Sequence, residues 1–250
     1  MKISFKGFSI FTILSVVSFF LLSFGYVRHS TEKKVTGKKI SSGSMHGAMH
    51  GLVSSVYDSL HLENSGLSKE AYEYTVRGIE ELKAKGELQN DSIVTICDFS
   101  RPSSEKRMYI IDLNNYRVLF NTWVAHGRNS GKEMAASFSN TMSSNKSSLG
   151  FYRTGDTYIG GNGYSLKLHG LEKGINDRAL ERAIVLHGAD YVSPTFLQAN
   201  GFMGRSYGCP AVSSREAAPI INAIKGGTCL FIYSNDRSYL AHSALLQPAA

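Results

Sequence analysis

Cysteine is scarce in this 250-residue sequence, which contains only Cys97, Cys209 and Cys229. An odd number of cysteines cannot pair completely, so at least one thiol has no disulfide partner within the chain. The formal net charge is +7, which suits an anionic setting such as a membrane surface or a cell wall. There is, however, no long tract of lysine and arginine with interleaved aromatic residues, so nucleic acid is not an expected partner. Internal repeats are also absent, and the length suits one sizeable domain with a short appendage.

A long apolar run occupies the N-terminus. Lys2 and Lys6 precede apolar residues 8–27, which is the pattern of an export signal. Ser23-Phe24-Gly25 offers small residues for cleavage, with Tyr26 as the first mature residue. The run also reaches the roughly 20 apolar residues that a membrane span needs. Residues 1–27 are therefore a signal peptide or a signal anchor, and the basic residues that follow favour cleavage because they fit the positive-inside rule poorly for an anchor.

The next two segments differ in composition. Residues 28–50 are rich in Ser, Gly, Lys and His without apolar periodicity, which is typical of a flexible basic linker. Residues 51–90 are predicted to be helical, because Ser68 is a suitable N-cap, apolar residues recur after it at helical spacing, and Gly86 ends the run. This helix is expected to pack against the domain that follows.

Residues 91–240 have the pattern of a mainly antiparallel β-domain. Asn114-Asn115 is placed as a hairpin turn between two of its strands. Cys97 and Cys229 fall within apolar strands and are expected to be core residues, with a disulfide between them left open. The predicted strands cover residues 92–99, 107–113, 116–127, 149–160, 163–171, 182–189 and 228–234.

One helix is predicted inside this domain, over residues 214–224. Ser213 and Glu216 have the spacing of a capping box at its start, and Gly226-Gly227 ends it. Residues 241–250 are expected to form a C-terminal tail.

Cys209 stands in the stretch RSYGCPAV, whose Gly and Pro residues are typical of a loop. A cysteine is strongly nucleophilic once ionised, and the start of the following helix favours a thiolate. Ser206 and Gly208 allow the backbone to turn tightly, so that amide N–H groups converge on an oxyanion beside the sulfur. The pattern indicates the nucleophile of an acyl-transfer enzyme rather than an inert loop thiol.

His187 ends a predicted strand and is followed by Gly188, which makes it the candidate base for Cys209. His126 and His169 also precede glycine at strand ends, so the three histidines could line one cleft or bind zinc. No pair of ligands has the short spacing that is usual in zinc sites, and a zinc site would leave the Cys209 loop unexplained. We therefore expect no metal and no cofactor, and a zinc amidase is the last of the alternatives.

Together, His187-Gly188 and Ser206-Tyr207-Gly208-Cys209 resemble the signature of the L,D-transpeptidase (YkuD-type) catalytic domain, in which a strand-end His-Gly precedes Ser/Thr-His-Gly-Cys. The chain is more closely similar to the murein L,D-transpeptidase catalytic-domain subgroup, with Ser-x-Gly-Cys-Pro-Ala. The resemblance covers roughly residues 52 to 235 and includes the stretches ICDFSRPSSEKRMYIIDL, LFNTWVAHGRNSG, FSNTMSSNKSSLGFY, YSLKLHGLEKGIND, IVLHGADYVS and GRSYGCPAV.

This resemblance implies a β-sandwich or flattened barrel, with a helix after the nucleophile loop and an N-terminal helical segment. It implies an enzyme that acts on peptidoglycan stem peptides. Cys209 would be the nucleophile and His187 the base. The loop from Ser206 to Cys209 would supply the oxyanion hole through its backbone N–H groups, above all those of Gly208 and Cys209.

The resemblance also suggests a set of substrate contacts. Ser148 belongs to a stretch that stands where the wider family has a Thr-Pro-x-Gly-x segment beside the cleft. Arg205 could recognise a stem-peptide carboxylate. The expected substrate-binding residues are Tyr207, Arg205, Gly188, His169 and Ser148.

The sequence departs from the wider family at two positions and in one spacing. Tyr207 replaces a histidine, Ala211 replaces Asn or Arg, and eighteen residues separate His187 from Ser206. These departures support the alternative of a catalytically silent cell-wall-binding protein, whereas the presence of Cys209 and His187 favours an enzyme. With an amine as acceptor the enzyme would be a transpeptidase that forms 3-3 cross-links, and with water it would be an L,D-carboxypeptidase.

The export signal and the resemblance predict a bacterial protein of the periplasm or cell envelope. Its partners would be peptidoglycan stem peptides and, through the N-terminal segment, the inner membrane. An activated thiol at Cys209 would also be acylated by a carbapenem.

Overall fold

The computed structural model describes residues 56–247, which belong to one compact unit of the chain. The predicted signal segment 1–27 and linker 28–50 lie outside the described residues. Within 56–247, no helix combines the length and apolar character that crossing a membrane requires.

Helix α2 spans Lys69–Ala84 and confirms the helix expected after Ser68. The Ser68 hydroxyl accepts a hydrogen bond from the N–H of Ala71 at 3.3 Å and donates one to the carboxylate of Asp98 at 2.8 Å. Gly78 lies against the ring of Phe151, where a Cβ would come within 2.0 Å of the ring. This close approach lets α2 pack on strands β1 and β8.

The domain is built on one eight-stranded sheet in the order β3-β2-β1-β8-β4-β5-β6-β7. Neighbouring strands are antiparallel except for the parallel pairs β1–β8 and β6–β7, so the mainly antiparallel prediction is confirmed. The strands are β1 (Ile93–Asp98), β2 (Met108–Asp112), β3 (Arg117–Thr122), β4 (Gly150–Gly160), β5 (Gly163–Gly170), β6 (Val185–Ala189), β7 (Ala211–Ser213) and β8 (Cys229–Tyr233).

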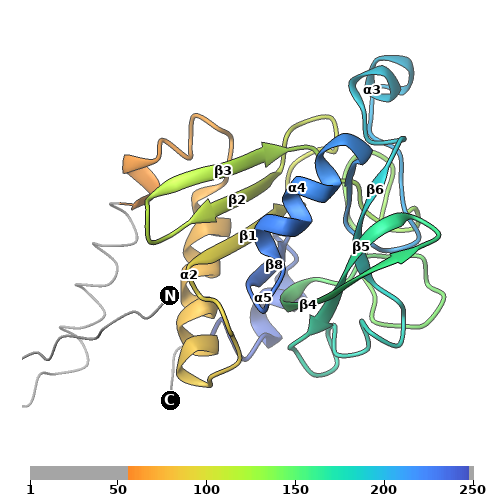
Figure 1. Cartoon of the computed structure of the whole chain (residues 1–250). Helices are drawn as coiled ribbons and strands as arrows, with labels where there is room; N and C mark the ends of the chain where they lie inside the picture. Colours follow the sequence, from red (N-terminus) through yellow and green to blue (C-terminus); the bar gives the residue numbers. More distant parts are fainter. Residues whose placement is uncertain (1–55, 248–250) are drawn as a thin grey trace, which may run out of the picture. The chain divides into compact units, whose positions relative to one another are not determined.

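The two ends of the sheet come together. The chain leaves β3 at Thr122, and Ala125 then forms an antiparallel bridge with Ala211 in β7. The sheet is therefore nearly closed, as expected for the flattened barrel. Helix α4 (Ser214–Ile224) contacts β1, β5, β6 and β7, and Figure 1 shows it between the two halves of the sheet.

Helix α4 has the predicted bounds, but the predicted capping box is wrong. The Ser213 side chain makes no capping hydrogen bond. The Glu216 carboxylate instead accepts a hydrogen bond from the Thr122 hydroxyl at 2.6 Å. Glu216 thus joins α4 to the end of β3, a long-range contact that competes with the local cap.

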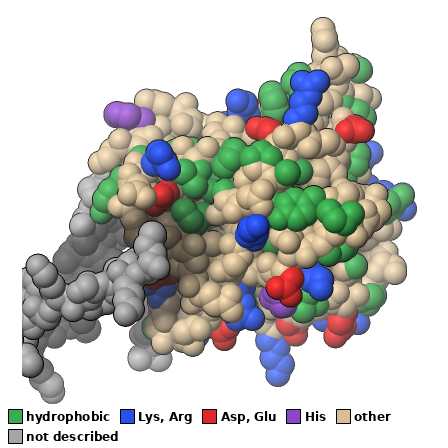
Figure 2. Space-filling model, in the orientation of Figure 1, with side chains coloured by type: hydrophobic (Ala, Val, Ile, Leu, Met, Phe, Trp, Pro, Cys, Tyr) green, Lys and Arg blue, Asp and Glu red, His purple; other side chains and the backbone are tan. Residues whose placement is uncertain are grey.

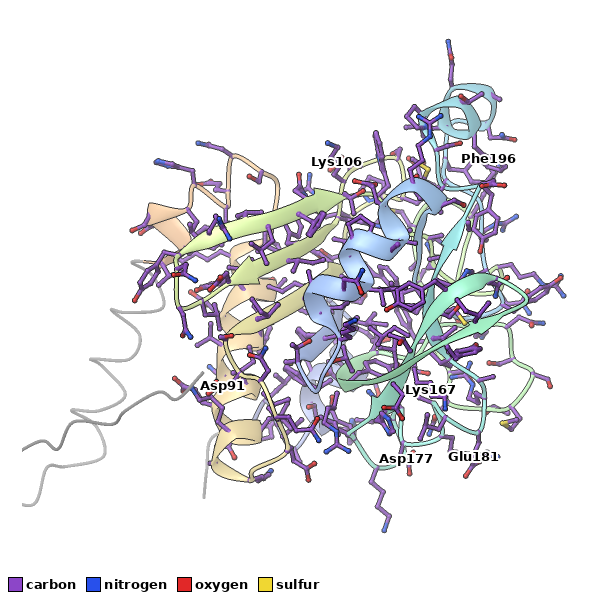
Figure 3. The ribbon with its side chains drawn as sticks, viewed as in Figure 1. Asp91, Lys106, Lys167, Asp177, Glu181 and Phe196 are labelled. Atoms are coloured by element: carbon purple, nitrogen blue, oxygen red, sulfur yellow. The ribbon has the colours of Figure 1, made fainter. Side chains whose placement is uncertain are left out.

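Three short elements were not predicted. Strand β7 has three residues, α3 spans Pro194–Asn200, and α5 spans Arg237–His242. Elements of this length contain too few residues for a period of two or of 3.6 to be visible. The two helices have side-chain caps, from Ser193 and Asp236, and Phe196 marks α3 in Figure 3.

The described part of the expected C-terminal tail, residues 241–247, contacts the domain. Leu245 and Leu246 are buried in the core, and the Arg77 side chain of α2 donates a hydrogen bond to the Leu246 carbonyl at 2.9 Å. Apolar side chains at these two positions make the segment part of the domain.

Cys97 and Cys229 are buried core residues without a disulfide. They lie on neighbouring parallel strands, but Cys229 pairs with Val94, three residues before Cys97. At about 3.3 Å per residue the two cysteines are offset by roughly 10 Å, which is too far for a disulfide.

On the surface, Figure 2 shows Lys and Arg side chains dispersed over one face, with Asp and Glu among them.

Candidate active site

The parallel pair β6–β7 brings the chain segments of Cys209 and His187 side by side. His187 is in β6 and its register partner in β7 is Ala211, two residues after Cys209. The backbone N–H of Val185, two residues before His187, is directed at the Cys209 sulfur. The predicted nucleophile and base therefore lie on adjacent segments of chain at one end of this strand pair.

The nucleophile loop, residues 205–210, is attached to the chain that follows β3. The Ser206 N–H donates to the His126 carbonyl at 3.0 Å, and the Arg128 N–H donates to the Ser206 carbonyl at 2.8 Å. Gly127 and Ser206 form an isolated parallel bridge. The same contacts that close the sheet thus position the loop that carries Cys209.

The Ser206 side chain makes two hydrogen bonds within the loop. Its hydroxyl donates to the Cys209 carbonyl at 2.6 Å and accepts from the Gly208 N–H at 3.0 Å. The Gly208 N–H, which was predicted to point into an oxyanion hole, is thereby engaged within the loop. Ser206 is buried and acts here as a positioning residue.

Ser147 is a second positioning residue, and the sequence analysis did not single it out. Its hydroxyl accepts from the Gly127 N–H at 3.0 Å and donates to the Gly208 carbonyl at 2.9 Å. Because a trans peptide unit holds its C=O and N–H in opposite directions, this bond turns the Cys209 N–H away from Ser147. That N–H lies toward the Cys209 sulfur.

The His187 side chain is in the tautomer that can accept a proton at Nε2. It is buried, and its Nδ1 lies 2.9 Å from the Gly188 carbonyl. A carbonyl can only accept, so Nδ1 carries the proton and Nε2 has a free lone pair. Burial lowers the pKa of His187, with the Gly188 hydrogen bond opposing the shift. The imidazole is therefore neutral at neutral pH.

Cys209 is a half-buried thiol. Its Sγ donates to the Ala183 carbonyl at 3.7 Å, and the structure gives no bond from this sulfur to His187 among residues 56–247. Burial raises the pKa of Cys209, while the Val185 N–H, the charge of Arg182 and its own N–H oppose that rise. The resting pair is thus a neutral thiol and a neutral imidazole.

Aromatic and basic side chains line the edge of the loop. Tyr207 is 69% exposed, and the Arg128 guanidinium lies 4.6 Å from its ring centre. Arg205 is exposed and donates to the carbonyls of Arg128 and Gly131 at 3.3 and 3.1 Å. This rim offers positive charge and an aromatic surface next to Cys209.

Three predicted substrate contacts lie elsewhere or are engaged inside the protein. The Ser148 hydroxyl is buried, donates to the Ser139 carbonyl and accepts from Arg182. Gly188 packs on the first turn of α4, where a Cβ would lie 3.0 Å from Ala217.

His169 is the third of these predicted substrate contacts. On β5 the register partner of His187 is Ser165, so His169 is about 13 Å further along the strand at 3.3 Å per residue. The structure does not bring His169 to the Cys209 site.

His126 is part of a buried network. Arg107 donates to His126 Nδ1 at 2.7 Å and to the Val124 carbonyl, so the His126 proton is on Nε2, facing the Gly131 carbonyl. Burial and the charge of Arg107 lower the pKa of His126 to about 3. No group of three His, Cys, Asp or Glu in the described part of the chain is suited to a metal.

Comparison of the sequence with models of known protein families gives a match. A sequence model described as the L,D-transpeptidase catalytic domain matches residues 63–233, more than half of the chain. No curated protein matches the sequence.

Solved structures with a related fold include an L,D-transpeptidase from Mycobacterium smegmatis (11% identity, 57% of this chain and 59% of that one, TM-score 0.35). Others are the helical cell shape determining protein Pgp2 from Campylobacter jejuni (13%, 64% and 55%, TM-score 0.38) and an L,D-transpeptidase from Stackebrandtia nassauensis (12%, 64% and 66%, TM-score 0.34). This chain spans less than two thirds of the length of each. The match over residues 63–233 carries the assignment: the chain belongs to the L,D-transpeptidase catalytic domain family.

Proposed function

We propose that this protein is a cysteine-dependent acyl transferase that acts on peptidoglycan stem peptides and forms 3-3 cross-links through a thioester. The observation that supports this most is the state of His187. Its Nε2 is an unprotonated base on the strand beside the Cys209 loop, and its Nδ1 is held by the Gly188 carbonyl. Binding to the cell wall alone would require neither an imidazole in this tautomer nor a half-buried thiol next to it.

In the first half-reaction, the thiol turns from the Ala183 carbonyl and gives its proton to Nε2 of His187. The sulfur attacks the carbonyl carbon of the third stem residue, forming a C–S bond. The C–N bond to the terminal D-Ala then breaks, and the imidazolium returns its proton to the departing amine. The Cys209 N–H is the donor available to the oxyanion, and one such donor contributes about 3 kcal/mol to the transition state.

In the second half-reaction, an amine of a neighbouring stem peptide attacks the thioester. A new amide forms, the C–S bond breaks, and the proton lost by the amine returns to the sulfur by way of His187. Arg205 and Tyr207 at the rim are proposed to hold a stem-peptide carboxylate and its backbone. The site of action would be the periplasm or cell envelope, and the N-terminal segment would be either removed after export or kept as a membrane tether.

The test is product analysis with a purified disaccharide-tetrapeptide. The wild-type protein should release D-Ala and give a dimer with a 3-3 cross-link. C209A and H187Q should lose at least 100-fold in rate, whereas H242Q, which changes an exposed histidine of α5, should not. Release of D-Ala without a dimer would mean an L,D-carboxypeptidase. Turnover by C209A, or no turnover and no acyl-enzyme in the wild type, would overturn the proposal.

A carbapenem gives an independent test of the acyl-enzyme. Its strained β-lactam carbonyl should be opened by Cys209, adding the mass of one carbapenem to the intact protein. Peptide mapping should place the adduct on Cys209, and C209A should gain no mass. An adduct-free protein that still turns over stem peptide would contradict the thioester mechanism.

A further inference from the structure

Arg182 occupies an unusual place beside the nucleophile loop. It is half-buried, and its guanidinium reaches across to the segment 139–148. All of its hydrogen-bond acceptors there are neutral oxygens: the carbonyls of Ser139 (2.7 Å) and Lys146 (2.6 Å) and the hydroxyls of Ser144 (3.2 Å) and Ser148. These bonds fix the guanidinium in one orientation.

The Arg182 guanidinium lies close to Gly208. A Cβ on Gly208 would be 3.4 Å from an Nη of Arg182 and 2.8 Å from the Lys146 carbonyl that Arg182 binds. Gly208 is buried and precedes Cys209. The positive charge of Arg182 therefore lies next to the loop that carries the sulfur, and it opposes the rise in the pKa of Cys209 that burial causes.

Among residues 56–247, no carboxylate forms an ion pair with Arg182. Its sequence neighbour Glu181 pairs with Arg178 at 3.0 Å. Figure 3 shows Glu181 at the periphery of the domain. A half-buried cation with only neutral partners loses hydration without gaining a counter-charge. An anion that forms nearby only during the reaction would supply that counter-charge.

Burial and the Ala183 carbonyl disfavour an anion at the sulfur, while the backbone N–H groups of Val185 and Cys209 favour it. The Ala183 carbonyl, which directs partial negative charge at Cys209, is held in place by a backbone with φ of +53°, a left-handed conformation that is uncommon for alanine. A positive charge on another side of the sulfur would add to the stabilisation that these two N–H groups give a thiolate.

We propose that Arg182 is a positioning residue whose guanidinium charge stabilises the Cys209 thiolate while its hydrogen bonds support the loop at Gly208. This inference deepens the proposed function and rests on it only in taking Cys209 as the nucleophile. Strand β7, which follows the Cys209 loop, consists of Ala211, Val212 and Ser213 and has no charged side chain. Arg182, just ahead of β6, would provide the charge from another part of the chain.

The test is the pH dependence of alkylation of Cys209 by iodoacetamide, followed by mass spectrometry on the full-length protein. Removing the charge in R182Q should raise the midpoint of the alkylation curve by about one pH unit, since a nearby opposite charge shifts a pKa by about 1–3 units. R182K keeps the charge and should stay close to wild type. R178Q, which changes an exposed arginine four residues earlier, is the matched control and should not shift the midpoint.

A folded R182Q with the wild-type midpoint would overturn the proposal. If R182Q does not fold, R182K carries the test, because the ammonium retains the charge but cannot form all the bonds of the guanidinium. A folded R182K whose midpoint rises by a full unit would show that charge is not what matters. Alkylation needs no stem peptide, so a shifted midpoint stands even if turnover of the stem peptide is not found.

Discussion

Gly208 is the residue of the nucleophile loop whose conformation is most constrained. Its φ is +128°, and a Cβ there would lie 2.8 Å from the Lys146 carbonyl. Its own carbonyl is held by Ser147 and its N–H by Ser206. The hydrogen bonds of its N–H and its carbonyl together fix the orientation of the peptide that carries the Cys209 N–H.

We predict that G208A loses more than 10-fold in rate of D-Ala release and about 1–3 kcal/mol in free energy of unfolding, because a left-handed backbone and a crowded Cβ both oppose alanine. Steady-state kinetics and urea unfolding measure the two effects. The control is G161A, in the β4–β5 turn, where a Cβ would meet nothing within 4 Å. Equal behaviour of the two variants would contradict the role given to Gly208.

As the proposed base, His187 should set the acid limit of activity. Burial lowers its pKa below the ordinary value of 6.5, and the base form is the neutral imidazole. As pH falls, activity should therefore persist below pH 6.5 and decline only as pH passes through the lowered pKa of His187. A profile of kcat/KM against pH measures this limit, and an acid limb centred above 6.5 would contradict it.

At the scale of elements, Glu172 connects strands and helices behind the site. Its buried carboxylate accepts hydrogen bonds from the Phe151 N–H of β4 at 2.8 Å, the Tyr239 hydroxyl of α5 at 3.0 Å, and the Ser243 hydroxyl. It follows β5 and begins the segment that leads to Arg182 and β6. The position of Arg182 therefore depends on this buried cluster of hydrogen bonds.

E172A should lower the free energy of unfolding by about 3 kcal/mol, because it leaves buried donors without an acceptor. E181A, at an exposed glutamate, should change it by less than about 0.5 kcal/mol. Urea unfolding followed by circular dichroism compares the two. A loss in E172A no larger than that in E181A would mean that the cluster contributes little.

The same side chain gives stability a pH dependence. Burial raises the pKa of Glu172 above its ordinary value of 4.5, so the folded state binds the proton more tightly than the unfolded state. The part of its stability contribution that depends on pH is complete below that ordinary value and is lost as pH rises through the raised pKa, while the hydrogen bonds that its oxygens accept remain. The difference in stability between wild type and E172A should accordingly shrink as pH increases across this range.

At the scale of the whole molecule, the fold gives its three cysteines different reactivity. Cys97 and Cys229 are 0% and 1% exposed, and burial raises the pKa of Cys97 to about 12. We predict one thiol that reacts rapidly with Ellman's reagent in the native protein and three in denaturant. C209A should remove the rapid phase, and a second rapid thiol in the native protein would contradict the buried, unpaired state of Cys97 and Cys229.

The family and much of the fold could be predicted from the sequence, because local patterns carry them. The seven predicted strands and the helices α2 and α4 follow from hydrophobic periodicity, and each is present. The prediction of Cys209 as nucleophile and His187 as base came from their residue types and the glycines beside them, and the experiments on C209A and H187Q test it. Strand β7 and helices α3 and α5 were missed because they are too short to show a period.

What only the tertiary structure decided is how these parts meet. The tautomer of His187, the support of Gly208 by Ser147 and the unpaired charge of Arg182 all depend on contacts between segments that are distant in the chain. The Glu216–Thr122 bond replaced a predicted local cap for the same reason. Periodicity and spacing report the local preferences of a backbone, whereas the partners of buried polar groups are set only when the sheet closes and brings remote segments together.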